Sequence, residues 1–212
     1  VGETENKQAI FVLLTSGKYA DPKMKQMILL KGTAAGGKST LSRELTRGYK
    51  TKNVGRFTAH ALDYADLEDC QILVLKELGN MDIEDTEKRG LSTLKFLSSD
   101  DQGYTVEMPV RDEETKRFKN VQYKIPAITV ISTTTRLNLD PQFERRTWLF
   151  NVDETVEQTK RIAFWKAHNE TQKTQKLLGL RQYTDKEFSR EVLKRFIEQL
   201  DPVNVIIPFP QT

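Results

Sequence analysis

Residues 32–39 read Gly-Thr-Ala-Ala-Gly-Gly-Lys-Ser, which matches the pattern G-x-x-x-x-G-K-[ST] at every position. An apolar run at 27–30 precedes this stretch, and Leu41 and Leu45 follow it one helical turn apart. A strand before the pattern and a helix after it are the setting in which it forms a phosphate-binding loop, the P-loop. We therefore expect the chain to be organised around a nucleotide site.

The residue types of the loop indicate what it would bind. Glycines allow the backbone N–H groups and the start of the following helix to face an anion, and Lys38 adds a cation. The hydroxyl of Ser39 would supply a ligand for Mg²⁺. ATP is the expected nucleotide, with GTP as the alternative. The residues expected to surround it are Gly32, Thr33, Ala34, Ala35, Gly36, Gly37, Lys38, Ser39 and Thr40.

Composition excludes several other classes of protein. The 33 basic residues are nearly balanced by 30 acidic ones, so a nucleic-acid site has to be local rather than global. One cysteine, Cys70, excludes an internal disulfide, and two histidines give little material for a histidine metal site or a Ser-His-Asp triad. No apolar run approaches the ~18 residues of a membrane span. We expect a cytoplasmic protein with no membrane contact. Because the chain begins at Val1 rather than Met, we interpret it as part of a longer protein.

A second apolar run, 71–77, ends in Lys76 and Glu77. A carboxylate at the carboxyl end of a parallel strand next to the P-loop strand can reach Mg²⁺ and the attacking water. We therefore predict that Glu77 is a metal ligand and a catalytic residue. Lys76 stands where many P-loop ATPases have Asp. Either Glu77 alone binds the metal and activates the water, or Asp82 folds back toward the site.

The remaining pattern predicts an α/β fold: a five-stranded, mainly parallel sheet between helices, with a small helical C-terminal part. Residues 1–155 would form the core and residues 156–212 the helical segment. The polar stretch 48–55 is typical of a turn, and 169–176 of a connection between two helices. Further strands are expected at 56–61, 127–132 and 147–152, and further helices within 1–20 and at 84–97, 156–168 and 185–200.

Two segments of alternating polarity, 104–111 and 118–125, flank a polar stretch and predict a β-hairpin inserted in the core. Its tip and return strand carry basic residues interleaved with aromatic ones, which suits a single-stranded nucleic acid. Three acidic residues at 112–114 dilute the positive charge, so a plain solvated hairpin is the alternative. The residues expected to bind the nucleic-acid backbone are Lys116, Arg117 and Lys119.

A pair of threonines and a pair of arginines lie next to the last two expected strands. Thr134 and Thr135 end the strand after the hairpin, where a strand end would meet the γ-phosphate. Arg145 and Arg146 stand just before the last strand. The arginines are either a surface salt-bridge site or an arginine finger.

The P-loop, the strand ending in Glu77, the hairpin, the threonine-rich strand end and the arginine pair follow one another as in AAA+ ATPases. With a hairpin before the threonine-rich strand, the chain resembles superfamily 3 replicative helicases of viruses and plasmids, and minichromosome-maintenance-like helicases, over about residues 24–155. The resemblance implies Walker A at 32–40, Walker B at Glu77, sensor 1 at Thr134 or Thr135, a trans-acting finger at Arg145 or Arg146, and Arg161 as a sensor 2 candidate.

The resemblance also implies a ring, usually a hexamer, that moves along DNA as ATP is hydrolysed between subunits. The predicted function is the ATP-driven motor domain of a DNA replication helicase. Its expected location is the cytoplasm of a bacterial or archaeal cell, or of the host cell of a virus or mobile element. One alternative is a P-loop kinase of small molecules, with residues 104–125 as a substrate lid. Another is a nucleotide-binding regulatory module without turnover, which Lys76 in place of Asp keeps open.

Overall fold

A computed structural model of the 212-residue chain describes most of the predicted elements. The described residues are 2–19, 21–34, 36–55, 66–78, 94, 97, 103–111, 117–136, 139–180 and 183–200. The strand predicted at 56–61 and most of the helix predicted at 84–97 lie outside these ranges, as do Ala35, Asp82 and Lys116.

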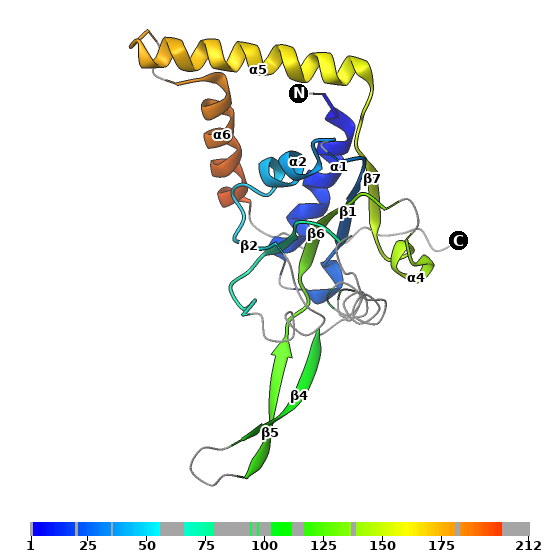
Figure 1. The fold of residues 1–212 in the computed structure, drawn as a ribbon. Helices are drawn as coiled ribbons and strands as arrows, with labels where there is room; N and C mark the ends of the chain where they lie inside the picture. Colours follow the sequence, from blue (N-terminus) through cyan, green and yellow to red (C-terminus); the bar gives the residue numbers. More distant parts are fainter. Residues whose placement is uncertain are drawn as a thin grey trace, which may run out of the picture.

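A five-stranded sheet forms the centre of the molecule (Figure 1). Its strand order is β2-β3-β6-β1-β7, and every neighbouring pair is parallel. The predicted fold class, an α/β fold with a parallel sheet and an inserted hairpin, is therefore confirmed. The strands are β1 (Met27–Lys31), β2 (Thr51–Val54), β3 (Ile72–Leu75), β6 (Thr129–Thr134) and β7 (Trp148–Asn151).

Helices pack around this sheet and extend beyond it. The α-helices whose bounds the described residues give are α1 (Thr4–Thr15), α2 (Lys38–Leu45), α4 (Pro141–Glu144), α5 (Val156–Leu177) and α6 (Asp185–Gln199). Two short 3₁₀ turns, η1 (Ser16–Lys18) and η2 (Pro22–Met24), connect α1 to β1. In Figure 1, α5 runs across the top of the molecule and α6 returns from its far end toward α2.

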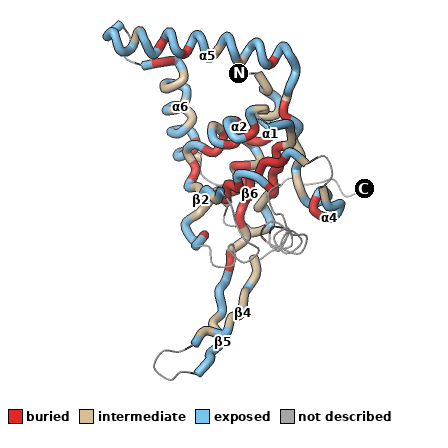
Figure 2. The backbone as a smooth tube through the Cα atoms, in the orientation of Figure 1, coloured by how far each residue is buried: buried red, intermediate tan, exposed pale blue. Residues whose placement is uncertain are grey.

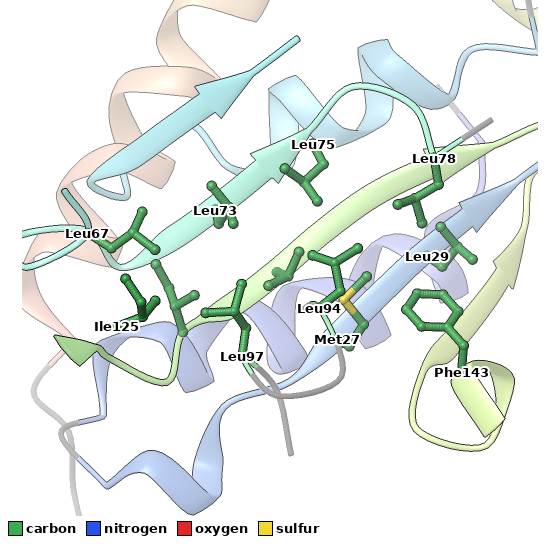
Figure 3. Close-up of a cluster of buried hydrophobic side chains, with 12 residues drawn as sticks. Met27, Leu29, Leu67, Leu73, Leu75, Leu78, Leu94, Leu97, Ile125 and Phe143 are labelled. Atoms are coloured by element: carbon green, nitrogen blue, oxygen red, sulfur yellow. The ribbon is translucent and has the colours of Figure 1, made fainter. Parts of the chain in front are cut away.

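Buried side chains form two clusters because successive residues of a strand point to opposite faces of the sheet. On one face, Met27 and Leu29 of β1 pack with Phe143 of α4 and with Leu94 and Leu97 (Figure 3). On the other face, the alternate strand residues pack against apolar side chains of α1 and α2. Figure 2 shows the buried backbone concentrated in the sheet and these helices. These clusters fix the carboxyl end of β1, from which the P-loop begins.

Three local predictions are wrong. The stretch 48–55 contains β2 rather than only a turn, because an edge strand pairs on one side and its half-exposed residues carry no apolar signal. The stretch 169–176 is part of α5, because its Glu, Gln, Lys and Thr side chains are compatible with an exposed helix. Glu77 follows a strand that is not adjacent to β1, since β6 lies between them.

The inserted hairpin consists of β4 (Tyr104–Arg111) and β5 (Phe118–Ile125), paired antiparallel from Tyr104↔Ile125 to Arg111↔Phe118. Ile125, at its base, is 3% exposed and belongs to the core. The rest of the ribbon extends away from the sheet in Figure 1. It leads directly into β6, so it leaves the sheet at the amino edge of the parallel strands, opposite the P-loop edge.

Helix α6 is attached to the P-loop helix by charge and by apolar packing. Both guanidinium nitrogens Nε and Nη2 of Arg190 donate to the carboxylate of Glu44 on α2, the Nε bond being 2.9 Å long. Ile197, 1% exposed, packs into the cluster shared with α1 and α2. Burial raises the pKa of Glu44, but the Arg190 hydrogen bond and neighbouring cations outweigh it, so the pKa lies below its ordinary value of 4.5.

We expect Glu44→Gln to lower the free energy of unfolding by about 1–2 kcal/mol at neutral pH, because the side chains of both partners are only a quarter exposed. A lowered folded-state pKa stabilises the protein above pH 4.5 and ceases to do so as the pH falls through the folded value. The difference between variant and wild type in urea unfolding should therefore shrink on acidification. Glu170→Gln, at an exposed pair with Lys173, is the control. Equal losses in both variants at pH 7 would contradict the coupling of α6 to α2.

Candidate nucleotide-binding site

The P-loop joins the carboxyl end of β1 to the start of α2, as the sequence predicts. Helix α2 begins at Lys38, so its first unpaired N–H groups lie at the loop. Gly37, just before it, has φ 87°, a left-handed conformation that other residues adopt only with strain. Local backbone geometry and the helix dipole thus both favour an anion at this position.

The amine of Lys38 is held inside the loop. Lys38 is 7% exposed, and its Nζ donates to the carbonyl oxygens of Gly32 at 2.8 Å and Thr33 at 2.5 Å. These two bonds fix a buried cation among the backbone groups of the loop. The residue predicted to bind phosphate is therefore placed where the loop can present it.

Glu77 lies at the same edge of the sheet. It follows β3, is exposed, and accepts a hydrogen bond from the hydroxyl of Thr135 at 3.3 Å. Pairing between β3 and β6 continues past the end of β3, because Leu78 N–H donates to Thr133 O at 3.0 Å and the Thr133 hydroxyl donates to Lys76 O. The strand order therefore puts Thr135 between Glu77 and the P-loop.

Thr134 and Thr135 have different surroundings. Thr134 is fully buried, and its Oγ1 accepts a hydrogen bond from the Arg136 backbone N–H at 3.1 Å. Thr135 is exposed and bonds to Glu77. Of the two candidates that the sequence leaves open, the structure thus brings Thr135, and not Thr134, to the carboxylate.

Ser39 and Glu77 offer the oxygen ligands that Mg²⁺ prefers. Ser39 is exposed in the first turn of α2, and Glu77 is exposed at the end of β3. Because β6 lies between β3 and β1, the ends of these two strands are about two strand spacings, roughly 10 Å, apart. One exposed hydroxyl and one exposed carboxylate are donor types that suit a Mg²⁺ ion bound together with a nucleotide.

An acidic residue that the sequence did not single out also contacts the P-loop. Oε1 of Glu154 accepts the backbone N–H of Thr33 at 2.5 Å and the Thr33 hydroxyl at 2.9 Å. Glu154 follows β7, which pairs with β1 on the side away from β6. The rule that directed attention to Glu77, a carboxylate after a parallel strand near the P-loop, could have found Glu154 had the strand order been known.

Arg145 and Arg146 are exposed just after α4, immediately before β7 begins at Trp148. Because β7 runs parallel to β1 and Trp148 pairs with Ile28, the arginines lie at the amino edge of the sheet. They are therefore at the opposite edge from the P-loop of their own chain. Arg161, the sensor 2 candidate, is exposed in the second turn of α5.

The hairpin carries exposed basic and aromatic side chains near its tip. Arg117 and Lys119 are exposed, and Phe118 between them is 72% exposed. The register pairs Phe118 with Arg111, which is also exposed and which sequence analysis did not select. Only the cross-strand pairing reveals that Arg111 and Phe118 share one face of the ribbon.

The sequence matches no protein-family profile, and no curated protein matches it. Among solved structures, the X-ray structure of JCV helicase is 17% identical with a TM-score of 0.49, and the match covers 93% of this chain and 57% of that chain. A compound-bound structure of JCV helicase is 16% identical with a TM-score of 0.47, covering 80% and 47%. A possible uridine kinase from Bacillus stearothermophilus is 13% identical with a TM-score of 0.33, covering 82% and 94%.

This chain spans 57% of the length of the first helicase structure. None of the described helices is long and apolar enough to cross a membrane. The P-loop between β1 and α2 and the parallel sheet with an inserted hairpin are observed directly. The chain is an α/β protein with the fold of a P-loop NTPase.

Proposed function

We propose that the chain is the ATP-driven motor domain of a DNA helicase that acts in replication. The observation that carries the proposal is the division of groups between the two edges of the sheet. Lys38, Glu77 and Thr135 gather at the carboxyl edge, whereas the basic hairpin and the arginine pair lie at the amino edge. Such a division lets one edge hydrolyse a nucleotide while the other contacts a polymer or a neighbouring subunit.

At the carboxyl edge, the P-loop N–H groups and Lys38 would bind the phosphates. Glu77 would accept a proton from the attacking water, and the Thr135 hydroxyl would orient its carboxylate through the observed hydrogen bond. We assign the sensor role to Thr135 in place of Thr134. Mg²⁺, held by Ser39 and Glu77, would neutralise the charge that develops on the phosphates.

At the amino edge, the hairpin would contact single-stranded DNA. Arg117, Lys119 and the neighbouring Lys116 would contact phosphates, and Phe118 would stack on a base. Arg145 and Arg146 would act on the nucleotide of the next subunit, because they lie across the sheet from their own P-loop. Head-to-tail contacts of this kind close into a ring when the rotation permits, and we propose a hexamer.

Phosphate release by the purified chain, measured with and without single-stranded DNA, tests the proposal. A helicase motor should release more phosphate when DNA is present, and Lys38→Ala should abolish the release. A kinase would instead transfer phosphate to a small acceptor, and its rate would not respond to DNA. A constant low rate under every condition, with nucleotide bound, would favour a regulatory module and contradict the proposal.

The hairpin assignment predicts a change in the salt dependence of DNA binding. Each of Lys116→Gln, Arg117→Gln and Lys119→Gln should reduce the magnitude of the slope of log affinity against log salt by about 0.7, because one phosphate contact on a single strand is lost. Phe118→Ala should instead weaken binding by about 1–3 kcal/mol with an unchanged slope.

Fluorescence anisotropy with a labelled oligonucleotide at several salt concentrations measures both quantities. Lys173→Gln, on the exposed surface of α5, is the matched loss of charge away from the hairpin. If the three charge variants and Lys173→Gln give the same slope as the wild type, and Phe118→Ala binds as tightly as the wild type, the hairpin has no role in binding DNA.

A further inference from the structure

Glu154 makes a contact with the P-loop that the proposed chemistry does not use. A single carboxylate oxygen, Oε1, accepts both the backbone N–H and the hydroxyl of Thr33. We infer that Glu154 is a positioning residue, which holds the first part of the P-loop in the shape that binds phosphate. The inference rests on the proposed function, because it presupposes that this loop binds a nucleotide.

The chain on both sides of Glu154 is held firmly. Before it, Asn151 pairs with Lys31 in the β7–β1 ladder, and Val152 N–H donates to Lys31 O at 2.9 Å. After it, the Thr155 side chain caps α5 by accepting the Gln158 N–H at 3.2 Å. Glu154 therefore connects a strand pair and a capped helix to the loop, and it can act as a fixed anchor.

Two glycines leave the space that the carboxylate occupies. A β-carbon added at Gly32 would lie 2.7 Å from Oε1 of Glu154, and one added at Gly36 would also overlap this oxygen. Gly32 is a required glycine of the loop pattern, whereas Gly36 stands at one of its variable positions. Their missing side chains thus permit a close approach of Glu154 in addition to the approach of a phosphate.

The obvious competing interpretation is electrostatic. A carboxylate close to a triphosphate site should repel the ligand, so removing its charge would strengthen nucleotide binding. If Glu154 anchors the loop, removing its carboxylate should instead weaken nucleotide binding, because Thr33 then loses both hydrogen bonds to that carboxylate. The amide of Gln removes the charge but keeps an acceptor oxygen at the same reach. For Glu154→Gln, electrostatic repulsion therefore predicts tighter nucleotide binding, whereas an anchor predicts little change.

Glu154→Ala should raise the KM for ATP and the Kd for a fluorescent ATP analogue about tenfold, with kcat near that of the wild type, since Lys38 and Glu77 are untouched. This factor is the lower end expected for charged hydrogen bonds, because Glu154 is exposed. Glu154→Gln should stay within about twofold of the wild type. The control is Glu157→Ala, an exposed acidic residue in the first turn of α5.

Titration with the fluorescent ATP analogue and hydrogen exchange at the Thr33 amide in nucleotide-free protein are measured on all four proteins. The inference requires weaker binding and faster Thr33 exchange in Glu154→Ala alone. Tighter binding by both Glu154 variants, or faster exchange with unchanged affinity, would overturn it. If the wild type binds no nucleotide, the proposed function fails as well, whereas unchanged exchange in Glu154→Ala rejects the anchor independently of any nucleotide.

Discussion

Replacing Arg145 and Arg146 together by alanine is expected to lower ATP hydrolysis by roughly 10³- to 10⁵-fold while nucleotide binding persists. An arginine that reaches the phosphates in the transition state has effects of this size in other NTPases. The pair lies just before β7, at the edge of the sheet opposite the P-loop of the same chain. Its target would therefore be the nucleotide of a neighbouring subunit, and activity should rise more than proportionally with protein concentration.

Mixing two inactive variants tests this sharing of the site. The double arginine variant keeps an intact P-loop, and Lys38→Ala keeps intact arginines, so adjacent subunits can form a complete site between them. Partial ATPase activity should appear on mixing and neither variant should be active alone. Arg195→Ala, an exposed arginine that pairs with Glu191 on α6, is the control. If the mixture stays inactive, or if the double arginine variant hydrolyses ATP normally, the arginines have only a surface role.

Glu77→Gln should reduce hydrolysis by roughly 10²- to 10⁴-fold with nucleotide binding retained, because the amide keeps the shape of the side chain but cannot accept a proton from water. Thr135→Val should have a smaller effect in the same direction, since it removes the hydroxyl that orients the carboxylate. Single-turnover hydrolysis and the affinity for a non-hydrolysable ATP analogue separate the two steps.

Glu68→Gln, an exposed carboxylate just before β3, controls for a general effect of charge. Asp82→Asn tests the alternative that the sequence leaves open. If Glu77→Gln hydrolyses ATP normally and Asp82→Asn does not, the metal-binding carboxylate is Asp82 and not Glu77.

The parts of the fold that the sequence predicts best have a local chemical cause. The P-loop pattern requires particular residue types at fixed spacing, so Lys38 could be assigned without knowledge of the sheet. The two hairpin strands alternate in polarity because they lack a covering layer on at least one face, and both have the bounds that the sequence predicts. The buried strand β3 is a continuous apolar run for the opposite reason, because both of its faces are covered.

The parts that could not be predicted depend on which strands become neighbours. The sequence does not say that β6 lies between β3 and β1, and this order decides that Thr135 bonds to Glu77. It likewise does not say that β7 lies beside β1, which brings Glu154 to Thr33. Both contacts join residues more than fifty positions apart, where local pattern carries no information.

The most direct test of a motor is movement along DNA. Displacement of streptavidin from the end of a biotinylated single-stranded oligonucleotide measures it, with the wild type and Lys38→Ala compared at equal DNA occupancy. The wild type should displace streptavidin at a rate that depends on ATP, and Lys38→Ala should leave the spontaneous rate unchanged. Phosphate release stimulated by DNA, with wild-type displacement no faster than that of Lys38→Ala from either end, would contradict the assignment of a translocating motor.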